Sequence, residues 1–317
     1  MARTEPVPAG RRGEMGELVR ATRPRQWSKN LLVFAAPLLS GRFTEIAVLA
    51  DAVVAFVAFT LAAAGIYLVN DVRDVESDRL HPVKRLRPIA AGTLGARTAV
   101  WASAVLSVAA LLVALIAGPA LVAVVAIYLA LSLAYCLVLK DEPVIDIAII
   151  ASGFLLRAIA GGAAAGIELS QWFLLAASFG SLFMAAGKRY AEILQVAGGE
   201  PTLRATLESY SPSYLRFVWT VSAGLLIMTY GLWAFELGEA AGGSWWYVGS
   251  MAPFVLAVLR YALDVDRGTA GEPEELALRD RTLEIFAGCW LVMVAVAVYA
   301  GGRLTAAVWR AGRAPVR

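Results

Sequence analysis

Long apolar runs separated by short polar segments make up most of the chain. A helix needs about 20 apolar residues to cross about 30 Å of hydrocarbon, and runs of this kind recur almost to the C-terminus. The pattern predicts an all-α, polytopic membrane protein with about nine transmembrane helices. Their approximate ranges are 27–40, 46–71, 98–117, 119–139, 144–162, 172–190, 213–237, 245–263 and 281–301.

The apolar runs define one transmembrane domain with a tail at each end. The first run is short, and an amphipathic lead-in over residues 16–26 would help it to reach across. We expect a single domain over residues 16–302, a flexible tail at 1–15 and a C-terminal tail at 303–317. The arginine-rich N-terminus lacks the short apolar core and small-residue cleavage site of a removable signal peptide.

Composition narrows the class of protein further. With 59% hydrophobic and only 17% charged residues, the chain is not an ordinary soluble domain. Two cysteines exclude a secreted disulfide scaffold. The sequence contains no Walker loop, no dinucleotide-binding glycine pattern and no zinc-ligand spacing, and no nucleic-acid partner is expected. Because homo-oligomers are common, a homo-oligomer stays open.

Lysine and arginine are distributed unevenly, although the net charge is only +3. Most lie in the N-terminus, in 73–97, at Lys140, in 188–216 and in 260–281, segments that fall on one side of the predicted membrane. Positive loops stay in the cytoplasm, so we expect a multi-pass protein of the inner (plasma) membrane whose N-terminus and site face the cytoplasm. Arginines in the C-terminal tail disagree with nine spans; eight or ten would explain them.

Two segments on the basic side are too long and too charged to be simple connections. They cover about 72–97 and 188–212, and each should form a cytoplasmic cap over the helix ends. One follows the second span and the other the sixth. This spacing suggests a weak repeat of four-helix units, a common way to build a membrane cavity.

Acidic side chains gather at the end of the second predicted span. If the helix continues, Asp71, Asp74 and Asp78 lie at positions i, i+3 and i+7 of one face, with Asn70 beside them. Hard oxygen ligands in this arrangement suit Mg²⁺, which shares its shell with phosphate oxygens. A solvated acidic helix end is the alternative, although ionisable groups next to a membrane core are usually functional.

Basic side chains follow at once. Lys84, Arg85 and Arg87 could hold the outer oxygens of a metal-bound polyphosphate, or they could only mark the cytoplasmic side and contact anionic lipid. His81 is the single histidine of the chain. We interpret it as an exposed loop residue rather than a catalyst.

A second charged cluster lies at the next helix junction. Asp146 follows Lys140 and stands inside an apolar run, so it needs a partner. It is a candidate metal or hydrogen-bond anchor, and Lys140 is a candidate phosphate ligand. Arg157 is about 16 Å further along the same helix, so the two charges cannot meet there. A third cluster, at Lys188 and Arg189, closes the sixth span.

The pattern Asn-Asp-x-x-Asp-x-x-x-Asp after a second span, with a Tyr…Lys…Asp element after the fourth, resembles the UbiA superfamily of intramembrane prenyltransferases. Several stretches are similar to its phosphoribosyltransferase branch, and the similarity covers nearly the whole chain apart from about the first 15 residues and the tail. These stretches are 23–30 (RPRQWSKN), 67–74 (YLVNDVRD), 84–92 (KRLRPIAAG), 187–192 (GKRYAE), 207–210 (LESY) and 278–281 (LRDR).

The resemblance implies a UbiA-like helix bundle around a central cavity. It implies transfer of a 5-phosphoribosyl group from phosphoribosyl pyrophosphate to a polyprenyl phosphate such as decaprenyl phosphate, with Mg²⁺ as cofactor, in cell-wall arabinan (arabinogalactan) synthesis. The lipid tail would stay in the bilayer. The three aspartates would be catalytic and, with Asn70, would hold the metal. The remaining substrate-binding candidates are Arg23, Arg25, Lys29, Asn30, Tyr67, Lys84, Arg85, Arg87, Tyr135, Lys140, Asp146, Lys188 and Arg189.

The chain departs from the superfamily pattern at the second acidic motif. Two carboxylates four residues apart are not present, because Asp141 and Asp146 are five apart. Fewer carboxylates and more cations would suit a donor that carries an extra phosphate. The nearest rival function is a prenyltransferase with a polyprenyl diphosphate donor and an aromatic acceptor. A transporter is a more distant rival, since it would place charges near span midpoints rather than at one membrane face.

Overall fold

The computed structural model describes residues 13–197, 207, 209–241, 245–269 and 280–300. Within these residues all regular secondary structure is helical, which confirms the predicted all-α class. The long helices are α3 (Ile46–Arg73), α5 (Ala96–Ile116), α6 (Pro119–Leu137), α7 (Ile145–Ala165), α8 (Gln171–Ala197), α10 (Pro212–Ala240), α12 (Met251–Asp266) and α14 (Arg281–Tyr299). The short ones are α1 (Glu14–Ala21), α2 (Ala35–Leu39), α4 (Val75–Leu80) and α11 (Trp245–Gly249), with the 3₁₀ helices η1 (Pro24–Phe34), η2 (Lys84–Leu86) and η3 (Leu139–Asp141).

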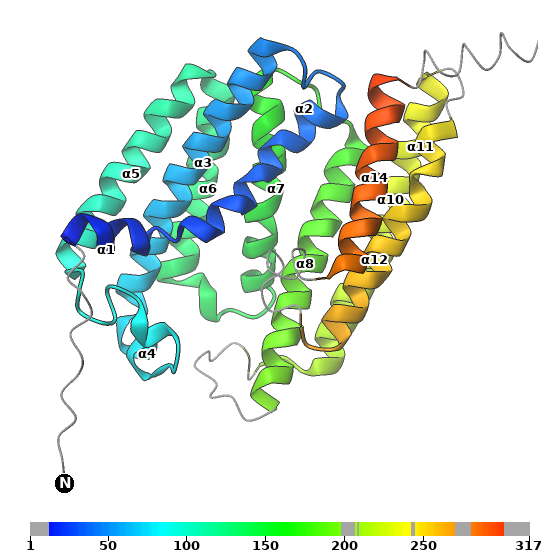
Figure 1. The fold of residues 1–317 in the computed structure, drawn as a ribbon. Helices are drawn as coiled ribbons and strands as arrows, with labels where there is room; N and C mark the ends of the chain where they lie inside the picture. Colours follow the sequence, from blue (N-terminus) through cyan, green and yellow to red (C-terminus); the bar gives the residue numbers. More distant parts are fainter. Residues whose placement is uncertain (1–12, 198–206, 208, 242–244, 270–279, 301–317) are drawn as a thin grey trace, which may run out of the picture.

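The long helices form one bundle of two groups (Figure 1). Helices α3, α5, α6 and α7 lie on one side, α8, α10, α12 and α14 on the other, and α7 packs against α8. In the described ranges seven helices are long and apolar enough to cross a membrane, with α11 and α12 taken together. The predicted count of nine is therefore not confirmed. Helix α8 is less apolar because Ser178, Ser181 and Lys188 interrupt it, and residues 27–40 form η1 and α2 instead of one α-helix.

Local sequence sets where several helices begin. The Ser211 hydroxyl accepts a hydrogen bond from the Tyr214 amide at 3.1 Å and caps α10. The Asp280 carboxylate accepts from the amides of Thr282 and Leu283 at 2.9 and 3.2 Å and caps α14. Each cap satisfies backbone donors that the first helical turn leaves unpaired.

Helix α5 shows how the bundle divides its faces between protein and lipid. Ser103, Ala110 and Ala114 are buried on the side that packs on α3. Trp101 and Leu112 are exposed on the other side. Small residues allow the two backbones to approach closely, and the bulky apolar side chains suit a lipid environment.

The N-terminal segment enters the bundle along η1, which crosses in front of α7 in Figure 1. Arg23, just before η1, has a left-handed backbone conformation with φ 54°. Further along, the backbone of η1 lies directly on α7 at Gly161. A Cβ atom at Gly161 would clash directly with the Val33 carbonyl oxygen. Glycine is required there because two backbones touch.

Short elements close one end of the bundle, which we call the α4 end. Helix α1 lies across this end, and α4 projects from it (Figure 1). Glu17 accepts a hydrogen bond from Thr93 at 2.9 Å, and Arg20 donates to the Leu86 carbonyl at 3.0 Å. The expected cap at 72–97 therefore contains α4 and η2. Of the expected cap at 188–212, the first part continues α8 to Ala197, and residues 198–206 and 208 lie outside the described residues.

Candidate active site

The acidic segment does not continue as one helix. Helix α3 ends at Arg73, Asp74 has φ −95° and ψ 9°, and α4 begins at Val75. The break rotates the α4 side chains relative to α3. The expectation that three carboxylates share one face therefore differs from the structure. Among the described residues no group of three or more His, Cys, Asp and Glu side chains converges to hold a metal alone.

Asp71 and Asp78 do meet, at a shared arginine. Arg87 Nη1 lies 3.2 Å from Asp71 Oδ1 and 2.6 Å from Asp78 Oδ2. Arg23 also donates to Asp71, and its guanidinium lies 4.9 Å from the centre of the Tyr67 ring. The carboxylates of Asp71 and Asp78 are 2% and 5% exposed, whereas both arginine side chains are 25% exposed. We call Arg23, Asp71, Asp78 and Arg87 the acid–arginine cluster.

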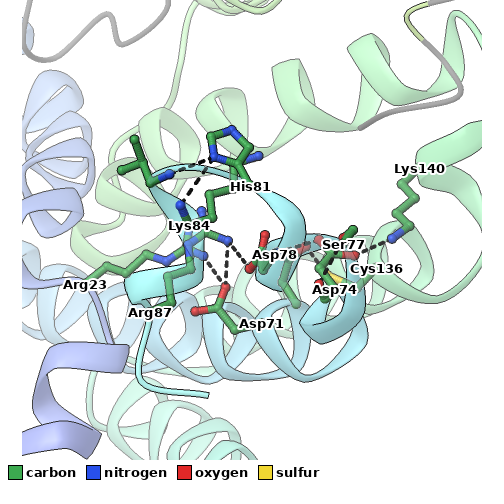
Figure 2. Close-up of polar contacts among 12 residues, drawn as sticks. Arg23, Asp71, Asp74, Ser77, Asp78, His81, Lys84, Arg87, Cys136 and Lys140 are labelled. Atoms are coloured by element: carbon green, nitrogen blue, oxygen red, sulfur yellow. Dashed lines mark hydrogen bonds and ion pairs between the residues drawn. The ribbon is translucent and has the colours of Figure 1, made fainter. Parts of the chain in front are cut away.

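Asp74 belongs to a separate pair next to this cluster. Lys140 Nζ, on η3, lies 2.5 Å from Asp74 Oδ1, and Asn70 Nδ2 donates to Asp74 Oδ2 at 3.1 Å. Figure 2 shows Asp74 directed toward Lys140 while Asp71 and Asp78 meet at Arg87. Cys136 Sγ lies 3.8 Å from the Asn70 oxygen. The predicted metal ligands therefore divide into two adjacent sets, each balanced by cations.

The donor chemistry of these residues fits Mg²⁺. The ion commonly binds through one or two protein carboxylates and completes its shell with substrate phosphate oxygens and waters. Asp71 and Asp78 supply two carboxylates held by one guanidinium, and Asp74 supplies another nearby. A third convergent carboxylate is not needed when phosphate oxygens fill the other positions.

A second ionic network joins α6, α7, α8 and the segment before α10. Asp146 is completely buried and accepts from Arg189 Nε at 2.8 Å. Arg189 also donates to Glu192 at 2.6 Å and to the Tyr135 hydroxyl at 3.1 Å. The Tyr210 hydroxyl donates to Asp146 at 2.5 Å. We call Asp146, Arg189 and Tyr210 the clamp, because these three residues belong to three different segments of the bundle.

The clamp also fixes the loop that carries Lys140. Val144 has an unfavourable φ of 71°, and its amide donates to the Tyr210 hydroxyl at 2.5 Å. A β-branched residue adopts this conformation only when its surroundings hold it there. Burial of the Tyr210 hydroxyl, followed by its hydrogen bond to Asp146, raises the pKa of Tyr210 well above its usual range. The hydroxyl therefore remains a donor at neutral pH.

Other predicted residues lie around these groups. Asn30 is buried deeper, where it contacts Arg157 instead of the acidic segment. Lys29 lies on η1 and Lys188 on α8, both partly buried, and Arg25 and Arg85 are exposed. Lys84 begins η2. As predicted, Asp146 and Arg157 do not pair: each has its own partners.

Sequence reasoning missed two residues. His81 is not a simple exposed loop residue, because its Nδ1 accepts from the amides of Val83 and Lys84 at 3.1 and 3.3 Å (Figure 2). It holds the turn that leads to Arg87. Tyr210 was noticed only as part of a similar stretch. A tyrosine ahead of a helix-starting Ser-Pro gives no signal for a partner 64 residues away.

The described residues thus form a helical membrane bundle with buried carboxylates and partly exposed cations gathered at one end. Comparison with known proteins agrees: residues 31–280 match the model of the UbiA prenyltransferase family. The chain belongs to this family and is a multi-pass membrane protein.

Curated relatives are similar over most of their length. The chain is 53% identical over 293 residues to decaprenyl-phosphate phosphoribosyltransferase of Mycolicibacterium smegmatis, covering 89% of this chain and 92% of that protein. It is 53% identical over 288 residues to the enzyme of the same name from Mycobacterium tuberculosis, covering 90% and 95%. The resemblance to this branch of transferases is thus confirmed.

Solved structures support the fold. A UbiA homologue from Archaeoglobus fulgidus bound to DMAPP and Mg²⁺ superposes with a TM-score of 0.68 at 18% identity, covering 90% of this chain and 99% of that one. At this identity the likeness shows the fold alone.

Proposed function

We propose that this protein transfers the 5-phosphoribosyl group of phosphoribosyl pyrophosphate to a polyprenyl phosphate, such as decaprenyl phosphate, and releases diphosphate with Mg²⁺ as cofactor. The observation that carries the proposal is the acid–arginine cluster: buried carboxylates held by guanidinium groups that stay a quarter exposed. The names of the curated relatives support the substrate pair.

The cluster suits a donor that carries a diphosphate. Mg²⁺ bound there would neutralise the oxygens of the leaving diphosphate. Arg23 and Arg87 can turn from Asp71 toward phosphate oxygens, because a guanidinium binds carboxylate and phosphate with the same geometry. Lys140 can do so from Asp74. Arg25, Lys29, Lys84, Arg85 and Lys188 are further candidates for phosphate contacts around these groups.

The reaction needs charge stabilisation more than a general base. The bond between the ribose anomeric carbon and the diphosphate oxygen breaks, and the diphosphate keeps the electron pair. An oxygen of the lipid phosphate, already an anion, forms the new bond to that carbon. Fixed cations aimed at the departing oxygens would stabilise the transition state.

The membrane provides the acceptor. A polyprenyl tail can stay among lipid chains while its phosphate reaches the α4 end of the bundle. We propose that this end faces the cytoplasm, where the soluble donor is available, and that the product serves cell-wall arabinan synthesis. The distribution of lysine and arginine along the sequence supports the orientation.

A donor assay tests the proposal. Purified protein in detergent or nanodiscs is incubated with a polyprenyl phosphate and labelled phosphoribosyl pyrophosphate, with and without a chelator. We expect a labelled, charged glycolipid that requires Mg²⁺. A parallel reaction offers a polyprenyl diphosphate and an aromatic acceptor. Product only in this second reaction would establish the rival prenyltransferase function.

A further inference from the structure

Arg157, in the middle of α7, is a buried cation with neutral partners. The residue is 6% exposed. Its Nε donates to Asn30 Oδ1 at 2.7 Å, its Nη1 to the Gly153 carbonyl at 2.6 Å and its Nη2 to the Tyr128 hydroxyl at 3.1 Å. In the described part of the chain no carboxylate pairs with it.

Its principal partner is held in place from the other side. Asn30 is completely buried, and its Nδ2 donates to the Thr60 hydroxyl at 3.0 Å. That hydroxyl in turn donates to the Phe56 carbonyl at 2.7 Å. The Asn30 amide therefore presents its oxygen to Arg157 in a fixed orientation, and the guanidinium is preorganised.

Arg157 lies about two helical turns deeper in the bundle than the clamp and Tyr135. On α7, Gly153 is seven residues from Asp146, and on α6, Tyr128 is seven residues from Tyr135. Seven residues are two turns, so each pair shares a face about 10 Å apart. Since Nη1 binds the Gly153 carbonyl, the guanidinium extends back toward the α4 end.

The segment from Arg23 through η1 gives independent evidence for the depth of Arg157 below Asp71. Arg23 contacts Asp71 and Asn30 contacts Thr60, so η1 runs antiparallel to α3. The seven residues from Arg23 to Asn30 span about 14 Å in a 3₁₀ helix. The eleven residues from Thr60 to Asp71 span about 16 Å in an α-helix. Arg157 therefore lies one level deeper in the bundle than Asp71 and the rest of the acid–arginine cluster.

Arg157 differs from the arginines of the acid–arginine cluster and the clamp in its charge balance, because no carboxylate of the described residues neutralises it. An unpaired charge inside a membrane protein is costly and commonly marks a ligand site. A guanidinium has five N–H donors. Three are used in the bonds described, and the guanidinium also lies 4.9 Å from the centre of the Tyr128 ring and 5.7 Å from that of Phe59. The rings balance part of the charge, but two N–H donors have no oxygen acceptor among the described residues. A phosphate group offers both the missing charge and the missing acceptors.

We propose that Arg157 binds the phosphate monoester group of a substrate that reaches below the acid–arginine cluster. This inference rests on the proposed function, in which two substrates carry such a group: the donor, at its 5-position, and the lipid acceptor. The recognising chemistry is the same for both.

Kinetics of Arg157→Gln and Arg157→Lys separate the two sources. We expect the KM for one substrate to rise about tenfold or more in Arg157→Gln, as for loss of a hydrogen bond to a charged group, with a smaller rise in Arg157→Lys. A rise confined to phosphoribosyl pyrophosphate identifies the 5-phosphate, and one confined to the polyprenyl phosphate identifies the lipid. Arg42→Gln, an exposed arginine paired with Glu45, is the matched control.

Asn30→Asp distinguishes binding from a structural role. The substitution is nearly isosteric and places a carboxylate against Arg157. We expect it to raise the same KM about tenfold while the melting temperature stays equal or rises, because the new anion competes with the substrate phosphate. If Arg157 only fastens η1, a better ion pair should leave KM unchanged.

Protection experiments keep the test independent of turnover. These experiments are done with a chelator present, so that no metal contributes to binding. Ribose 5-phosphate or a short polyprenyl phosphate should raise the melting temperature of the wild-type protein and of Arg42→Gln but not that of Asn30→Asp. Equal protection of all three proteins would overturn the proposal, as would KM values for both substrates that change together or stay within twofold. Absence of wild-type turnover would count against the proposed function instead, and the protection result would still be readable.

Discussion

The acid–arginine cluster and the clamp lie at the same end of the bundle, and each pairs buried aspartate with arginine. In both, a buried aspartate is neutralised by arginine: Asp71 is 2% exposed and Asp146 completely buried. The arginines differ. Arg23 and Arg87 are 25% exposed, whereas Arg189 is only 1% exposed.

This difference separates two roles that sequence alone treats as one. A partly exposed guanidinium can exchange its carboxylate for an incoming phosphate. The sealed guanidinium of Arg189 cannot do so, because its departure would leave the completely buried Asp146 unpaired, which is strongly unfavourable. We therefore propose that the clamp positions helices and the loop of Lys140, and that the acid–arginine cluster contacts substrate.

The largest effect is expected for Asp71→Asn. If Asp71 is a metal ligand, as we propose, loss of the carboxylate should lower kcat about 10²- to 10³-fold. The amide still accepts a hydrogen bond from a partly exposed arginine, so the melting temperature should change little. Turnover of labelled donor and thermal unfolding measure the two quantities. Asp51→Asn, at the other end of α3, is the control and should keep activity; wild-type kcat in Asp71→Asn would reject the metal role.

Arg189→Met should act on stability instead. The substitution leaves the buried Asp146 carboxylate without a cation, which should lower the free energy of unfolding by about 3–5 kcal/mol. The melting temperature in detergent should fall by many degrees. Arg23→Met is the matched variant from the other network. It should lose activity while unfolding close to the wild-type temperature. Equal melting temperatures for the two variants would remove the distinction between the networks.

Arg87→Ala tests whether the exposed cations bind the donor. Loss of a guanidinium that contacts diphosphate should raise the KM for phosphoribosyl pyrophosphate by about ten- to a hundredfold, with a smaller change in the KM for the lipid. Initial rates over a matrix of both substrates give the two values. An unchanged donor KM would place Arg87 outside the binding site.

Tyr210→Phe should have the smallest effect and a distinctive pH dependence. The Val144 amide loses its acceptor and Asp146 a donor, which costs about 1–3 kcal/mol. Because the pKa of Tyr210 is raised in the folded protein, its contribution is complete below the ordinary tyrosine pKa of 10 and is lost as the pH rises further. Melting temperatures of wild type and variant should therefore differ at pH 7 and converge at high pH. A constant gap would contradict the role of the hydroxyl.

Much of the fold was predictable because membrane helices carry a strong signal. The apolar runs predict α3, α5, α6 and α7 to within a few residues. The prediction of one transmembrane helix over residues 27–40 was wrong. Helices η1 and α2 obtain their shape from contact with α7 rather than from their own periodicity. The break at Asp74 was not predictable, since neither glycine nor proline marks it.

The chemistry of the site was visible in the sequence, but its pairing was not. Asp71 and Asp78 were identified from spacing, and so were the cations nearby. That Lys140 pairs with Asp74, and Arg189 with Asp146, depends on how α6, α7 and α8 pack. A charged residue within an apolar run is predicted to need a partner. Which residue becomes that partner depends on the tertiary structure.

The contact of η1 with α7 at Gly161 has a consequence for how this protein tolerates change. Because a Cβ atom there would clash with the Val33 carbonyl oxygen, even alanine would push the N-terminal arm outward. Arg23 and Asn30 both belong to that arm, so one added methyl group would disturb their contacts with Asp71 and Arg157 without altering any charged residue. Gly161, which has no side chain, thus controls the alignment of the polar side chains of Arg23 and Asn30.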